Sequence, residues 1–145
     1  MKPLLIALLM GICTPIFAQE IDLRAIAKIE SAGCKAPCIG DNGKAIGIYQ
    51  IHKGVVADFN RIGPRRSLQP LSHLDMKSDK EAGIVADWYL NVEIPRLLKH
   101  YGLPDSLDNR LTAYNMGIGR VKEGKRASKY IAKYNTFIKY LSLGA

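Results

Sequence analysis

Apolar residues recur at helical spacing along most of this chain, and glycines and prolines interrupt them at short intervals. Spacings of three and four residues place side chains on one face of an α-helix, which can then pack against its neighbours. Glycine and proline end or kink helices, so each expected helix has only a few turns. The pattern therefore predicts an all-α single domain made of short helices.

The expected helices are separated by loops rich in turn-forming residues. They comprise 21–32, 52–61, 78–92, 96–101, a helix that begins at Ser106 or Asp108 and ends at Met116–Gly117, and 125–141. Gly33 is expected to end the first of these helices, Ser78 to cap the start of the third and Gly102 to end the fourth. Pro95 either kinks the third helix or begins the fourth. Residues 63–75 are expected to form a loop, and the short apolar run 45–51 has no clear assignment. Near residues 33–50 we expect a small irregular lobe or a short hairpin.

The first 18 residues have the features of a leader rather than of a folded segment. Lys2 supplies a positive start, residues 4–12 form an apolar run, and Ala18 ends a cleavage-like sequence. The expectation is a signal peptide over 1–18, cleavage near Ala18 and export to the periplasm or the medium; an uncleaved membrane anchor is the alternative. Cleavage would leave 127 residues (19–145), enough for one domain.

The chain is basic, with 21 lysines and arginines against 13 acidic residues, and removal of Lys2 lowers the net charge from +8 to +7. A positive surface favours anionic partners. Export argues against nucleic acid and leaves acidic lipids or cell-wall polymers. Several of the positive charges were expected on the last helix, where they would form either a binding surface or only a solvated face: Lys122, Lys125, Arg126, Lys129 and Lys133.

Two cysteines remain after the leader, Cys34 and Cys38, and an oxidising compartment favours a disulfide between them. Such a small ring would stiffen the loop that follows the first helix. Two free thiols, or half of a metal site, are the alternatives. His52, His73 and His100 lack ligand-like spacing, so neither a metal nor another cofactor is expected.

Glu30 is a single carboxylate at the end of an apolar helical stripe that includes Leu23 and Ile26. The spacing points Glu30 toward the interior, where partial desolvation raises the pKa of a carboxyl group. A carboxylic acid that stays protonated near neutral pH can act as a general acid. The alternative is a glutamate at a frayed helix end that faces water.

Three separated segments combine glycines with isolated polar side chains in an apolar frame: 29–33, 40–51 and 113–119. This composition suits a groove for a neutral polar polymer such as a sugar chain. Gln50 and Asn115 each carry a donor and an acceptor for an acetamido group, while Tyr49 and Tyr114 offer ring faces and hydroxyls. Each of these residues taken singly also fits a role in the core or in a turn.

Together the segments resemble the catalytic domain of soluble lytic transglycosylases, members of the lysozyme-like superfamily of α+β proteins. That family has a Glu-Ser pair at a helix end, a Gly-Leu-Met-Gln-Ile-like segment and an Ala-Tyr-Asn-Ala-Gly segment. The counterparts here are Glu30-Ser31, then 47–51, then 113–117, in the same order. Tyr130-Ile131 resembles the Tyr-Val pair that closes the family's groove. The chain departs from the pattern in the insert between the two cysteines, in Tyr49 where methionine is common, and in Met116 where a small residue is usual.

The resemblance implies that 19–145 cleaves the MurNAc–GlcNAc β-1,4 bond of peptidoglycan and forms 1,6-anhydroMurNAc ends. Glu30 would be the catalytic acid and then the base, helped by the substrate's acetamido group. The substrate-binding residues would be Ser31, Tyr49, Gln50, Tyr114, Asn115 and Tyr130. The expected partners are glycan strands and, by analogy with small exported members of the family, a secretion or conjugation apparatus; the protein itself is expected to be a monomer.

Two other functions remain open. Residues 40–43 and 47–50 also resemble goose-type lysozymes, whose first water-activating acid matches Asp41; the second falls at His52, which is not acidic. Asp41 and His52 are therefore candidate auxiliary residues, and a hydrolytic muramidase is the nearest alternative. The other is a non-catalytic glycan-binding protein, which would keep Gln50, Tyr114 and Asn115 but would not need a desolvated Glu30.

Overall fold

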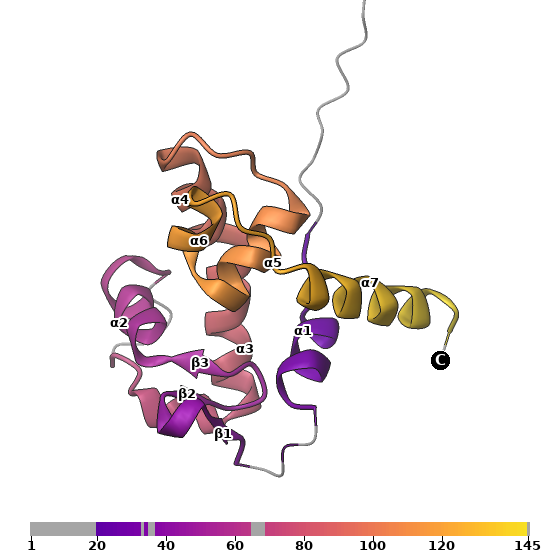
Figure 1. Ribbon diagram of the computed structural model, residues 1–145. Coiled ribbons are helices and arrows are strands. Elements are labelled where there is room, and N and C mark those ends of the chain that lie inside the picture. The colour runs from indigo at the N-terminus through magenta and orange to yellow at the C-terminus, as the bar shows by residue number, and fades with distance from the viewer. Residues whose placement is uncertain (1–19, 33, 35–36, 65–68, 145) are drawn as a thin grey trace, which may run out of the picture.

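The computed structural model describes residues 20–32, 34, 37–64 and 69–144. This part of the chain is mostly helical and includes a small three-stranded antiparallel sheet (Figure 1). The expected signal peptide and Gly33, which was expected to end the first helix, lie outside the described residues. Among the residues that are described, no helix is long and apolar enough to cross a membrane.

Apart from α6, which was not expected, the helices follow the expected order, and their ends differ by a few residues. They are α1 (Leu23–Glu30), α2 (Lys53–Ile62), α3 (Asp79–Trp88), α4 (Ile94–His100), α5 (Leu107–Met116), α6 (Ile118–Lys122) and α7 (Ser128–Ser142). A continuous core joins α1, α3, α4, α5 and α7, with Ile26, Leu90, Leu98, Leu111 and Tyr134 almost fully buried.

Helix α1 carries Glu30 at its last position. At its start the Asp22 side chain accepts a hydrogen bond from the Arg24 amide, which satisfies a free N–H of the first turn. The Asp22 amide in turn donates to the Tyr134 hydroxyl at 3.0 Å, which ties α1 to α7. Ile26 has no exposed surface. The helix is shorter than the expected 21–32 because its caps are Asp22 and Ser31.

Helices α3 and α4 form one continuous helical segment through a π-helical turn, Tyr89–Glu93. Ser78 caps α3, as expected, and Gly102 follows α4 with a φ of +65°. Pro95 lies in the first turn of α4, directly after the π-helical turn, which agrees with the alternative that it begins the fourth helix. A proline in a helix lacks an N–H and its ring clashes with a carbonyl of the preceding turn; the wider π-helical turn just before Pro95 relieves that conflict.

The small lobe consists of β1 (Ile39–Gly40), β2 (Ala45–Ile46) and β3 (Ile51–His52) in the order β1-β2-β3. Both pairs are antiparallel, with Ile39 opposite Ile46 and Ala45 opposite His52. A 3-10 turn, Asp41–Gly43, connects the first two strands. Of the two alternatives for residues 33–50, the short hairpin is thus correct. Part of the apolar run 45–51, which had no clear assignment from the sequence, belongs to the strands β2 and β3.

Three expectations about the remaining elements were wrong. The last helix begins at Ser128 rather than 125, so of the five basic residues placed on it only Lys129 and Lys133 belong to α7. Helix α6 was missed because its five residues are too few to show a period and glycines flank and interrupt it. The expected loop 63–75 overlaps a 3-10 helix, His73–Lys77, which Ser72 and Asp75 stabilise as a capping box.

Candidate functional site

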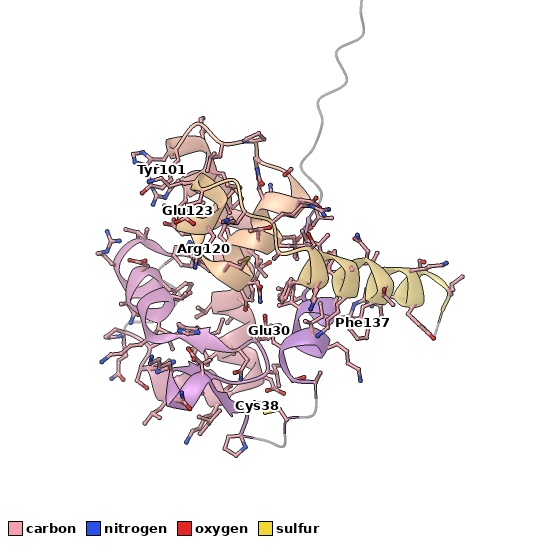
Figure 2. All side chains as sticks on the ribbon, in the orientation of Figure 1. Glu30, Cys38, Tyr101, Arg120, Glu123 and Phe137 are labelled. Atoms are coloured by element: carbon pink, nitrogen blue, oxygen red, sulfur yellow. A yellow bond between two sulfur atoms is a disulfide. The ribbon has the colours of Figure 1, made fainter. Side chains whose placement is uncertain are left out.

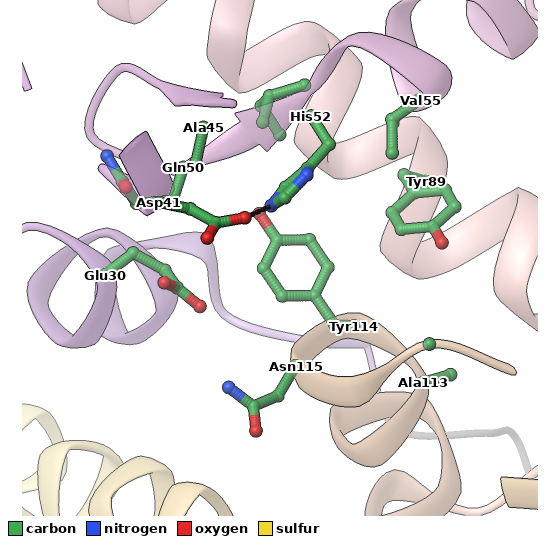
Figure 3. Close-up of a pocket in the computed structure, with 12 residues that line it drawn as sticks. Glu30, Asp41, Ala45, Gln50, His52, Val55, Tyr89, Ala113, Tyr114 and Asn115 are labelled. Carbon is green, nitrogen blue, oxygen red and sulfur yellow. Dashed lines mark ion pairs between the residues drawn. The ribbon is translucent and has the colours of Figure 1, made fainter. Parts of the chain in front are cut away.

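A cavity of about 460 Å³ lies where the end of α1, the β-lobe and the end of α5 meet (Figure 3). Its wall also includes Val55 of α2 and Tyr89 of the π-helical turn. The lining residues are Glu30, Asp41, Ala45, Gln50, Ile51, His52, Val55, Tyr89, Ala113, Tyr114, Asn115 and Gly117. All three segments singled out in the sequence contribute to this one wall. The volume lies within the range of ordinary ligand-binding pockets.

Glu30 enters the cavity from the last position of α1 and is only partly exposed. Burial raises the pKa of its carboxyl group, and this is the dominant influence. A hydrogen bond from Tyr130 and the positive charge of Lys133 act in the opposite direction and offset part of the rise. The direction agrees with the expectation from the helical stripe. A carboxyl group held in this state can donate a proton to a bound molecule.

Tyr130 comes from the first turn of α7, 100 residues after Glu30 in the chain. Its hydroxyl donates a hydrogen bond of 2.7 Å to Glu30 Oε1. Burial and the nearby Glu30 carboxylate raise the pKa of Tyr130 far above its ordinary value, so the phenol stays protonated. Tyr130 is therefore a fixed donor that orients the Glu30 carboxyl group rather than a titrating group.

Replacing Tyr130 by phenylalanine should raise the pKa of Glu30 further. The hydrogen bond from Tyr130 favours the charged carboxylate and lowers this pKa, whereas burial, which raises it, would persist in the variant. The side-chain carbon chemical shift of Glu30, followed by NMR over a pH titration, measures the change directly. An unchanged or lower pKa in the Tyr130→Phe protein would contradict the proposed balance of burial and hydrogen bonding.

Asp41 and His52 face the same cavity from the β-lobe. His52 Nε2 lies 3.7 Å from Asp41 Oδ2, and both side chains are more than half exposed. Asp41 adopts a φ of +47° and Gln50 a φ of +49°, in the left-handed region that residues other than glycine rarely occupy. Strained backbone of this kind is concentrated at functional sites. The two side chains form a polar, water-accessible part of the wall.

Gln50, Tyr114 and Asn115 also line the cavity, as the sequence predicted. Gln50 uses its amide nitrogen internally, donating to the Gly47 carbonyl at 3.0 Å. Tyr114 donates its hydroxyl to the Tyr49 carbonyl at 2.7 Å, so its ring and not its hydroxyl is the group offered to a ligand. Within the described part of the chain the Asn115 amide has no hydrogen-bond partner, and it points into the cavity (Figure 3).

Three of the expected substrate-binding residues do not line the cavity: Ser31, Tyr49 and Tyr130, the last of which contacts the lining residue Glu30. Ser31 donates its hydroxyl to the Ala27 carbonyl at 2.6 Å and so closes the last turn of α1. Tyr49 is 9% exposed and belongs to the core, where its ring lies beside Gly83 of α3. Ser31 and Tyr49 instead support the wall: Ser31 follows Glu30 directly, and the Tyr49 carbonyl holds Tyr114.

Cys34 and Cys38 are paired as a disulfide, as the sequence predicted. The Cys34 amide donates to the Ser31 carbonyl at 2.9 Å, and the Cys38 carbonyl accepts from the Gly47 amide at 2.7 Å. The disulfide therefore connects the end of α1 to the turn that follows β2. Glu30 lies on one side of this connection and Gln50 on the other, so it links two walls of the cavity.

Tyr89 and Lys133 are functional candidates that the sequence did not single out. Tyr89 falls within the expected helix 78–92, and its ring forms part of the cavity wall, 5.9 Å from the Tyr114 ring. Lys133 was one member of a basic run, and its proximity to Glu30 depends on how α7 crosses α1. No local signal in the sequence distinguishes either residue from its neighbours.

The described residues contain no group of three or more histidine, cysteine and acidic side chains that would hold a metal ion. The chemistry that the site offers is one desolvated, oriented carboxyl group, one exposed Asp–His pair, amide groups and aromatic faces. Comparisons of the chain with protein-family models, with curated proteins and with solved structures found no match.

Proposed function

We propose that this protein is a lytic transglycosylase with a lysozyme-like fold that cleaves the MurNAc–GlcNAc β-1,4 bond of peptidoglycan. The observation that carries the proposal is Glu30: a desolvated carboxyl group of raised pKa, oriented by Tyr130, in the wall of a cavity large enough for sugar rings. The order of the matching segments in the sequence supports the same family. The proposal requires export, which the leader-like residues 1–18 would provide.

In the proposed reaction, protonated Glu30 gives its proton to the glycosidic oxygen as the bond to C1 of MurNAc breaks. The acetamido oxygen of the same sugar stabilises the positive charge at C1 from the opposite face. Glu30, now a carboxylate, takes the proton from the C6 hydroxyl as that oxygen bonds to C1. The products are a GlcNAc end and a 1,6-anhydroMurNAc end, and Glu30 is protonated again.

The other lining residues fit this substrate. The Asn115 amide, which bonds to none of the described residues, can bind an acetamido or hydroxyl group with both a donor and an acceptor. The rings of Tyr89 and Tyr114 offer apolar surface for sugar faces. A transglycosylase needs one acid and no activated water. Of the two carboxyl groups among the described cavity residues, Glu30 is partly buried, with a pKa raised by that burial, whereas the Asp41 side chain is more than half exposed.

Digestion of purified sacculi tests the proposal. Mass spectrometry of the soluble products should show muropeptides with 1,6-anhydroMurNAc ends, 18 Da lighter than the products of hydrolysis because no water is added. Digestion in H₂¹⁸O should leave these ends unlabelled. The absence of any soluble muropeptide would reject the enzymatic function and favour a non-catalytic glycan-binding protein.

A hydrolytic muramidase is the second candidate, and the Asp41–His52 pair favours it. Both side chains face the cavity that holds Glu30, and a carboxylate beside an imidazole can accept a proton from water. Reducing ends that carry ¹⁸O, together with loss of activity in Asp41→Asn, would establish hydrolysis. Under the transglycosylase proposal Asp41→Asn keeps its anhydro products and loses less activity, because Asp41 then mainly orders its turn.

The disulfide offers a further prediction under this function. The Cys34→Ser, Cys38→Ser double variant should melt close to the parent, because a ring of five residues constrains the unfolded chain little. Its turnover should fall by up to about 10²-fold, since a shift of about 1 Å between catalytic groups has that effect. Thermal melts and initial rates of muropeptide release measure the two quantities.

Reductant provides the control for this prediction. Dithiothreitol should slow the parent to the rate of the double variant and should leave the double variant unchanged. Two free thiols in the purified, exported protein would contradict the premise. A double variant with the parent's rate would show that the disulfide does not position Glu30.

A further inference from the structure

Helix α7 carries only positive charges, and no ion pair with a described residue offsets them. It contains Lys129, Lys133 and Lys139 and no acidic residue. Every arginine in the described part of the chain contacts a carboxylate: Arg24, Arg61, Arg96, Arg110, Arg120 and Arg126. The three α7 lysines form no ion pair with any described residue. Their charge is therefore available to a partner outside the chain.

One flank of α7 leads away from Glu30. Tyr130, Lys133, Phe137 and Tyr140 follow one another at spacings of three, four and three residues, which places them along the same flank of the helix. We call these four residues the α7 strip. Tyr130 bonds to Glu30 and Lys133 is close enough to influence it, whereas Phe137 is partly buried and Tyr140 is 63% exposed.

The part of the strip that is farthest from the cavity projects from the body of the protein. Figure 1 shows the second half of α7 extending past α1, and Figure 2 places Phe137 on the side of α7 that faces α1, beyond Glu30. The buried residues of α7 are Tyr130, Ile131 and Tyr134, all in its first half. The described residues that line the cavity include none from α7. The strip begins at Tyr130, which contacts the lining residue Glu30, and extends outward from there with aromatic rings on either side of a cation.

We propose that the α7 strip is an extension of the site that binds the acidic peptide branches of the glycan strand. The Lys133 ammonium group would pair with a carboxylate of the branch, and Phe137 and Tyr140 would pack against its apolar parts. The inference rests on the proposed function for the identity of the strand. Two observations support this occupant: the positive charge of Lys133 complements an acidic branch, and the strip begins at Tyr130, in contact with the Glu30 carboxyl group of the cavity.

Binding to a non-cleaving protein tests the proposal independently of turnover. In a Glu30→Gln background, co-sedimentation would compare peptide-bearing glycan strands with strands whose peptides an amidase has removed. Lys133→Gln should weaken binding of the peptide-bearing strands about two- to fivefold, the range expected of an exposed ion pair, and should not affect the stripped strands. Lys139→Gln is the matched control: it removes the same charge from another face of α7 and should change neither affinity.

Three other outcomes overturn the proposal, and a fourth distinguishes it from the proposed function. Equal weakening on both kinds of strand would mean general attraction to the polymer rather than recognition of its peptides, and no weakening would remove Lys133 from the site. Binding of anionic phospholipid vesicles that is lost in Lys133→Gln, with no effect on strands, would make α7 a membrane-surface helix. Lys133-dependent binding to peptide-bearing strands in a protein whose parent cleaves nothing would reject the proposed function and retain this inference.

Discussion

Glu30→Gln is expected to reduce glycan cleavage by about 10²–10⁴-fold, the contribution typical of a general acid. Glutamine keeps the size of the side chain and can still accept the hydrogen bond that Tyr130 donates to Glu30 Oε1. It cannot give a proton to the leaving oxygen. Initial rates of muropeptide release from sacculi measure the loss, and sacculus binding should persist.

The matched control is Glu20→Gln, the same chemical change at an exposed position outside the cavity. It should leave the rate unchanged. Activity of Glu30→Gln within about threefold of the parent would rule out Glu30 as the general acid, because general acid catalysis contributes far more. The residual activity would then have to come from another carboxyl group, with Asp41 the first to test.

Stability measurements on the same variant separate loss of chemistry from loss of fold. Burial raises the pKa of Glu30 in the folded protein, so ionisation of Glu30 destabilises the fold once the pH exceeds the unfolded pKa. The free energy of unfolding of the parent therefore falls as the pH rises from the unfolded pKa of Glu30 through its folded pKa, whereas that of Glu30→Gln has no such contribution. The variant should melt at or above the parent at neutral pH, and the difference should shrink as the pH falls.

Gly47→Ala is expected to destabilise the protein by about 2–5 kcal/mol. Gly47 has a φ of +81°, where a side chain adds about 1–2 kcal/mol of strain. A Cβ at this position would also overlap the backbone carbonyl oxygen of Met76, and overpacking adds about 1–3 kcal/mol. Because the Gly47 amide bonds to Cys38 and its carbonyl to Gln50, the cavity wall should be disturbed as well.

Gly43→Ala is the control for the steric part of this effect. Gly43 lies in the same lobe with a φ of +88°, yet a Cβ there would meet no atom within 4 Å. It should show only the conformational cost of about 1–2 kcal/mol. Urea unfolding of both variants measures the difference. Equal decreases in the free energy of unfolding would show that the backbone near Met76 can shift to accommodate the added Cβ without an energetic cost.

Local structure and the functional groups available in each segment could be predicted from the order of the residues alone. Ser78 and Gly102 mark helix ends in the structure as they do in the sequence, because caps and left-handed glycines act through neighbouring backbone groups. The turn-forming residues 40–43 likewise sit in the predicted lobe. The raised pKa of Glu30 followed from an apolar stripe within one helix.

Which of these residues line the cavity, and which support its wall, depends instead on how the helices pack together in three dimensions. Tyr130 reaches Glu30 across 100 residues, and Lys133 lies near it, because α7 crosses α1. Ser31 and Tyr49 carry polar groups that could bind a ligand, yet in the fold the Ser31 hydroxyl bonds to the α1 backbone and Tyr49 is buried in the core. Helical periodicity defines the face of a helix but not its partner, since that choice depends on the packing of all the helices together.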